Sequence, residues 1–142
     1  MPSSIIADYQ AVASELLVNH PVLGGKISAA TGLADGQVAT MLREVLRFLH
    51  LIQSTDGPLT PPLQLDLAWH ELILFTRVYA SVCDSLFGGF IHHSPGGSEH
   101  ENRFQLRRTL KLYALTFGTP DPIYWGEQGY YGEPADCGAC QG

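Results

Sequence analysis

The sequence contains few charged residues and few cysteines, and both shortages limit the kind of protein it can encode. Only 15% of its 142 residues are charged, whereas 45% are hydrophobic. With this hydrophobic fraction the chain can bury a core, and its low charged fraction argues against disorder, so we expect an ordered domain. Three cysteines cannot form a complete disulfide framework, which favours a reducing compartment.

Basic residues are scarce as well, which argues against a nucleic-acid-binding role. Eight Lys and Arg residues stand against fourteen Asp and Glu residues, and the net charge is −6. Four of the basic residues fall between positions 103 and 111, a spacing typical of the solvated face of a helix. Residues 26–48 superficially resemble a helix-turn-helix, but the second helix offers few side chains for phosphates or bases. We therefore expect no nucleic acid partner.

Long apolar runs are also missing. No stretch of about 18 uncharged apolar residues exists, so no segment is predicted to span a membrane. The first ten residues lack a basic segment, which predicts that they are not a secretory signal. We expect a cytoplasmic protein whose partner, if it has one, is another protein or a second copy of itself as a homo-oligomer.

The apolar residues that are present recur at helical spacing, which predicts an all-α fold. Helices are expected over residues 5–19, 35–53, 62–87 and 98–117. Glycines follow the last two of these segments, as they often do at the end of a helix. Residues 22–34 hold three glycines, and only a short helical turn is expected there. The prediction is a small helical bundle of four main helices in one domain, residues 1–126.

The helix predicted over residues 62–87 is expected to lie at the centre of the bundle, because apolar residues cover most of its circumference. Beyond residue 118 the chain is rich in proline, glycine and aromatic residues, and this predicts an extended aromatic arm on the bundle. Its aromatic residues are Tyr124, Trp125, Tyr130 and Tyr131. Residues 127–142 are expected to form a C-terminal tail that contains glycine and cysteine.

Residues with metal-binding chemistry lie on and just beyond this central helix. Asp66 and His70 stand one turn apart on one helix face. A carboxylate so placed can bind a metal ion beside the histidine, or accept a hydrogen bond from the imidazole and orient it. It can also simply stabilise the first turn through the helix dipole. A lone histidine in an apolar helix is more often a core residue than a ligand.

His92 and His93 follow the glycine pair that ends the predicted central helix. Adjacent side chains in an extended segment point to opposite sides, so at most one of the two is expected to join a given site. His70 lies about 25 Å along a continuous helix from Phe87, at 1.5 Å per residue. A shared site therefore requires the loop after Gly88 to fold back along the helix.

Two further candidate ligands, Cys137 and Cys140, have the spacing of half a zinc site and also that of a redox pair. A redox role needs a βαβ context, which the sequence does not show. With two histidines, the cysteines would complete a closed tetrahedral site that holds the tail. The pair His70-Glu71 also matches the start of the HExxH protease motif, but Leu74 stands where the second histidine is required.

The middle of the chain resembles the glycine-rich domain-containing protein-like family, over roughly residues 40–126. The resemblance rests on LDLAWH at residues 65–70, on FGGFIHHSP at residues 87–95, and on a downstream stretch. The matching downstream residues are Leu110, Tyr113, Phe117, Gly118, Pro120 and Trp125. The family is poorly characterised, so the resemblance implies a fold and no particular reaction.

Two functions therefore stay open. The first is a metal-binding domain for zinc or iron that uses His70 and one of His92 and His93, assisted by Asp66 or by the two tail cysteines. If one coordination position of the metal stays open, a bound water could be activated there. If protein ligands fill all positions, the site is structural. The second is a protein-interaction module in which the histidines are structural. Neither a reaction nor a catalytic residue follows from the sequence.

Overall fold

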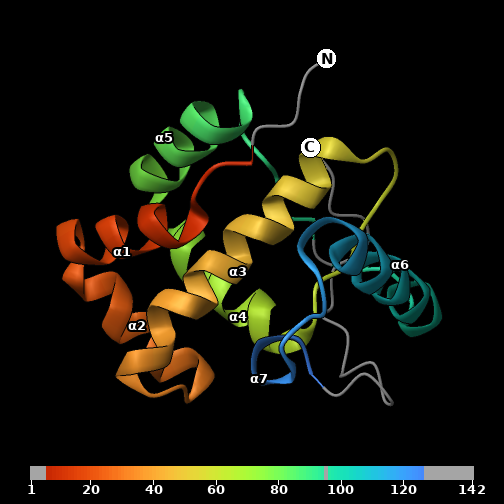
Figure 1. Ribbon diagram of the computed structural model, residues 1–142, viewed down its shortest axis with the longest axis horizontal. Helices are drawn as coiled ribbons and strands as arrows, with labels where there is room; N and C mark the ends of the chain where they lie inside the picture. The colour runs from red at the N-terminus through yellow and green to blue at the C-terminus, as the bar shows by residue number, and fades with distance from the viewer. Residues whose placement is uncertain (1–5, 95, 127–142) are drawn as a thin grey trace.

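The computed structural model describes residues 6–94 and 96–126, and within these ranges the chain folds into helices without β-strands. The helices are α1 (Tyr9–Asn19), α2 (Pro21–Thr31), α3 (Asp35–Ser54), α4 (Leu63–Leu74), α5 (Thr76–Phe87), α6 (Glu99–Phe117) and α7 (Pro122–Trp125). The all-α class is confirmed, as are the helices predicted over residues 35–53 and 98–117. The prediction of four main helices is wrong, because the described chain forms seven (Figure 1).

The N-terminal part of the chain forms two helices. Asp8 caps α1 by accepting a hydrogen bond from the backbone N–H of Ala11 at 3.0 Å. The segment after it, predicted to hold only a short turn, is the full helix α2. Proline at its first position and a left-handed Gly32 at its end (φ 74°) delimit this helix.

The predicted central helix over residues 62–87 is broken at Phe75, which has φ −85° and ψ 69° and separates α4 from α5. Across this break the indole N–H of Trp69 donates to the hydroxyl of Tyr79 at 3.1 Å. In an unbroken helix, residues ten apart would be separated by about 15 Å along the axis. The break therefore brings α5 back beside α4. No proline or glycine marks it, and for this reason the sequence pattern did not indicate it.

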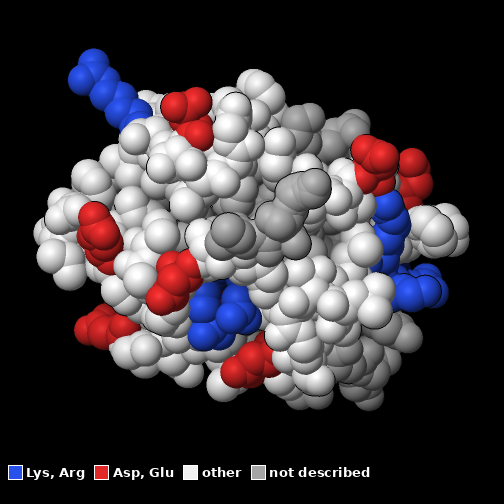
Figure 2. Space-filling view, turned by 45° about the horizontal axis from the view of Figure 1, so that its top comes forward, with Lys and Arg blue, Asp and Glu red and all other residues white. Residues whose placement is uncertain are grey.

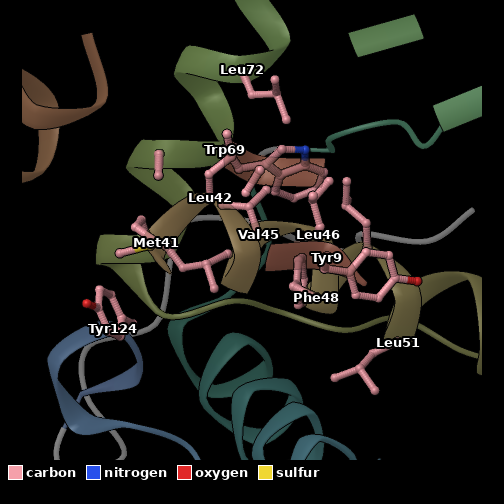
Figure 3. Close-up of a cluster of buried hydrophobic side chains, with 14 of the residues drawn as sticks. Tyr9, Met41, Leu42, Val45, Leu46, Phe48, Leu51, Trp69, Leu72 and Tyr124 are labelled. Atoms are coloured by element: carbon pink, nitrogen blue, oxygen red, sulfur yellow. The ribbon is translucent and has the colours of Figure 1, made fainter. Parts of the chain in front are cut away.

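The core is built around α3, which crosses the middle of the molecule (Figure 1). Its apolar side chains recur on the faces covered by α1, α2, α4 and α6. Figure 3 shows Trp69 and Leu72 of α4 above residues of α3 such as Phe48. The rings of Phe48 and Trp69 meet edge to face with centroids 5.5 Å apart. The helix α4 is thus held firmly on one side, while its other side carries Asp66 and His70.

A buried carboxylate joins the C-terminal helices to this core. Glu44 of α3 is fully buried and accepts hydrogen bonds from the hydroxyl of Tyr113 in α6 and from the indole N–H of Trp125 in α7, the latter at 2.6 Å. Arg43 and Arg47 pair with its other oxygen at 2.8 and 3.3 Å. Burial, reinforced by the carboxylate, raises the pKa of Tyr113, so its hydroxyl remains a donor.

The described part of the predicted aromatic arm is helical and packed. Tyr124 and Trp125 lie in α7 and are buried, so this portion is not an extended arm. Tyr130, Tyr131 and the tail over residues 127–142 lie outside the described residues.

Charged side chains are few and scattered on the surface, as the composition predicts. Figure 2 shows broad uncharged areas between isolated red and blue groups on one face. Among residues 6–94 and 96–126, none of the helices combines the length and the apolar character needed to cross a membrane.

Candidate metal centre

The helix α4 positions two of the residues singled out in the sequence. Asp66 and His70 are one turn apart on this helix, and one carboxylate oxygen of Asp66 lies 3.5 Å from Nε2 of His70. The Asp66 side chain is nearly buried at 6% exposure, whereas the His70 side chain is 48% exposed. The pair therefore has an inner carboxylate and an outer imidazole.

The loop after α5 brings a second histidine to this pair. Gly88 ends α5 in the left-handed conformation (φ 77°), and the chain then returns toward α4. Because the helix is broken at Phe75, the return does not have to cover the whole 25 Å expected for a straight helix. A shared site required the loop after Gly88 to fold back onto His70. The break at Phe75 and the course of the loop together bring this about.

His93 is the histidine that reaches the pair. Its Nε2 lies 2.7 Å from one oxygen of Asp66 and 3.0 Å from Nε2 of His70. The three donor atoms all lie within 4.8 Å of one another. Its ring also packs on Trp69, with centroids 4.5 Å apart, and its side chain is only 9% exposed. Two imidazole nitrogens this close to each other and to a carboxylate are held together by either a shared proton or a shared cation.

A buried hydrogen-bond chain fixes the loop that carries His93. The Tyr79 hydroxyl accepts from Trp69 and donates to the backbone carbonyl of Ile91 at 2.6 Å. Ile91 is fully buried, and its backbone also hydrogen-bonds the thiol of Cys83. Burial raises the pKa of both the Tyr79 hydroxyl and the Cys83 thiol, so each remains protonated at neutral pH. The sequence pattern does not indicate these roles of Trp69 and Tyr79, since only the break at Phe75 brings the two together.

Replacing Tyr79 with phenylalanine should loosen this loop without emptying the core. The change leaves the Ile91 carbonyl and the Trp69 N–H unpaired, which costs roughly 1–3 kcal/mol of unfolding free energy. Urea denaturation measures that loss, and hydrogen exchange should show faster exchange in residues 88–94. Tyr124→Phe, at a buried tyrosine of α7, is the matched control. Equal exchange of the loop in both variants would contradict the anchoring role of Tyr79.

His92, the other predicted ligand within the described residues, is not part of this group. His92 is exposed, and its ring lies beside Phe90 with centroids 4.7 Å apart. The expectation that at most one of the adjacent histidines faces a given site thus agrees with the geometry. Cys137 and Cys140 lie outside the described residues.

The spacing of the three donor atoms fits a divalent metal ion. Metal–ligand bonds of about 2.1 Å place neighbouring donors about 3.4 Å apart in a tetrahedron. At right angles, as in an octahedral site, the same bonds place them about 3.0 Å apart. The separations here are similar: the two imidazole nitrogens lie 3.0 Å apart, Oδ1 of Asp66 lies 2.7 Å from His93, and Oδ2, the other carboxylate oxygen, lies 3.5 Å from His70.

The fold and the cluster define a class: a small all-helical protein with two histidines and one aspartate converging at the surface. The chain belongs to the UCP032817-like family, whose model matches residues 19–115. The match includes Asp66, His70 and His93. The chain matches no curated protein and no solved structure.

The resemblance to the glycine-rich domain-containing protein-like family is wrong. The family match is to the UCP032817-like model, and no finding indicates a glycine-rich domain family. The motifs behind the resemblance, at residues 65–70 and 87–95, both lie inside the UCP032817-like match. Short motifs of this kind define a local helix–loop arrangement and do not by themselves identify a family.

Proposed function

We propose that this protein binds a divalent transition metal, zinc or iron, through Asp66, His70 and His93. The observation that carries the proposal is the convergence of three donor atoms of suitable type within 4.8 Å. The three come from two segments, one turn of α4 and the loop after α5, and the returning loop has its own anchor in Tyr79. Two histidines and one carboxylate are a donor set that both zinc and non-haem iron use.

The exposure of the residues favours an open coordination position. Asp66 and His93 are almost buried, whereas nearly half of the His70 side chain faces solvent. Three protein donors leave at least one position for water or for another ligand. A bound water could be activated there, which is the chemistry that such an ion supplies. The proposal includes no substrate and no reaction.

The alternative function is an interaction module in which the Asp66–His93 contact is a structural hydrogen bond. Two exposed apolar side chains, Leu74 four residues after His70 and Phe90 three residues before His93, favour an associating surface. The alternative differs from metal binding in one measurable respect, because it needs no ion.

Metal content and titration separate the two functions. The untagged protein is purified, analysed for metals, stripped with a chelator and titrated with Zn²⁺ and, without oxygen, with Fe²⁺. We expect one equivalent of metal, and quenching or shifting of Trp69 fluorescence on uptake because its ring contacts His93. The Trp69→Phe variant should lose this fluorescence change, whereas the control variant Trp125→Phe should retain it. If the protein binds neither Zn²⁺ nor Fe²⁺ tightly, the proposal is overturned and the interaction module is the remaining function.

A further inference from the structure

A small cavity lies where the last turns of α3 and α5 meet the start of α1. Its volume is about 210 Å³, and its lining includes Tyr9, His50, Gln53, Ser54, Leu86 and Phe87. None of the three candidate metal ligands lines it. Sites for drug-sized ligands have volumes of roughly 300–1,000 Å³, so this cavity suits a smaller molecule.

The electrostatics of this cavity are set by helix ends and not by charged side chains. No Asp, Glu, Lys or Arg belongs to its lining. Gln53 and Ser54 are the last two residues of α3, and Leu86 and Phe87 are the last two of α5. The last carbonyl groups of a helix lack N–H partners within it, and its C-terminal end carries roughly half a negative charge. Two such ends beside one cavity favour a cation there.

Aromatic rings form another part of the lining. Tyr9 packs on Phe87 with ring centroids 6.1 Å apart and on His50 with centroids 5.8 Å apart. The Tyr9 hydroxyl lies 2.7 Å from Nδ1 of His50. Burial raises the pKa of Tyr9 to about 12 and lowers the pKa of His50, so at neutral pH the hydroxyl donates and the imidazole is uncharged. A neutral imidazole does not repel a cation, and the faces of aromatic rings attract organic cations.

We propose that this cavity binds a small organic ammonium ion. The ends of α3 and α5 favour its positive charge, and the rings of Tyr9 and Phe87 favour the methyl or methylene groups around its nitrogen. Both side chains are nearly buried, at 5% and 8% exposure, which holds the rings in place. An anion of the same size would meet two helix C-termini and no basic side chain, so it is disfavoured. The ammonium site does not depend on the metal binding proposed above.

Three probes of similar shape test the charge preference. Choline carries a trimethylammonium group, neohexyl alcohol is choline with carbon in place of nitrogen, and the anion of tert-butylacetic acid carries a negative charge instead. Each is titrated into the isotope-labelled full chain without added metal, and amide chemical shifts report binding. We expect choline to bind at least about fivefold more tightly than the neutral alcohol, which corresponds to about 1 kcal/mol. The carboxylate should bind more weakly than either.

A variant that fills the cavity locates the site. Leu86→Trp places a larger side chain in the lining and should abolish choline binding. Leu115→Trp, at an exposed leucine of α6, is the matched control and should bind choline as the wild type does.

If circular dichroism shows that Leu86→Trp does not fold, Phe87→Leu replaces it as the test. This variant removes one aromatic ring and should weaken choline binding by about two- to fivefold. The proposal is overturned if no probe binds, if choline binds no more tightly than the neutral alcohol, or if the carboxylate binds most tightly. Choline binding that Leu86→Trp, or in its place Phe87→Leu, leaves unchanged also overturns it.

Discussion

Replacing His93 with alanine is expected to weaken the binding of Zn²⁺ by at least about 100-fold, or about 2.7 kcal/mol. His93 is the donor that lies close to both of the others, at 2.7 Å from Asp66 and 3.0 Å from His70. Loss of groups that only orient a metal ligand already costs roughly 10–100-fold in affinity, and a direct ligand should cost more. Isothermal titration calorimetry of the stripped protein measures the change.

The comparison with His100→Ala separates ligand loss from a general effect of removing a histidine. That residue lies exposed on α6, and its replacement should leave the affinity unchanged. Asp66→Asn should behave like His93→Ala, because the amide retains the shape of the side chain but loses the charge. If both variants bind Zn²⁺ as tightly as the wild type and keep its circular dichroism spectrum, then the ion binds elsewhere.

Replacing Glu44 with alanine is expected to lower the free energy of unfolding by about 3–5 kcal/mol, the cost of breaking a buried charged network. The fully buried carboxylate accepts from Tyr113 and Trp125 and pairs with Arg43 and Arg47. Without it, a buried hydroxyl and a buried indole N–H lose their acceptor, and two partly buried guanidinium groups lose their countercharge. The shift of the urea denaturation midpoint reports the loss.

Glu15→Ala is the matched control, since Glu15 is an exposed glutamate of α1 and its loss should change stability by less than about 0.5 kcal/mol. Glu44→Gln should fall between the two, because the amide oxygen still accepts a hydrogen bond. A loss of under 1 kcal/mol in Glu44→Ala would show that Glu44 does not join α6 and α7 to α3 as described.

The sequence predicts best those helices whose apolar spacing is regular and whose ends are marked. Val38, Met41, Val45 and Leu49 recur on one face of α3, and Ser98 caps α6 by accepting from Glu101. The helix α2 was underestimated because Gly24 and Gly25 lower helix propensity. An added Cβ on Gly24 would meet the side chain of Leu17 at 3.4 Å, an ordinary contact, so the packing of α2 on α1 does not require a glycine there.

Features that depend on contacts between distant residues could not be predicted. The break at Phe75 has no local signal, since it is stabilised by Trp69 and Tyr79 meeting across it. Glu44 lies off the apolar stripe of α3 in the sequence pattern, yet it is buried because Tyr113 and Trp125 arrive from more than sixty residues away. In each case tertiary packing overrides the local preference.

The sequence predicts which types of residue form the candidate site, but not which individual residues belong to it. The one-turn spacing of Asp66 and His70 indicates a shared helix face, and the doublet His92-His93 indicates that one of the two can join them. Which of the two does so depends on how the loop is attached. The hydrogen bond from Tyr79 to the carbonyl of Ile91 fixes the loop so that His93 faces α4 and packs on Trp69.

The location of the ion tests the central claim most directly. Crystals of the protein grown with Zn²⁺ and measured above and below the zinc absorption edge would give an anomalous difference map. We expect one strong peak per chain, at about 2.0–2.2 Å from the donor atoms of Asp66, His70 and His93. A zinc-loaded crystal with no peak between these three side chains, or with its peak at Cys137 and Cys140 alone, would contradict it.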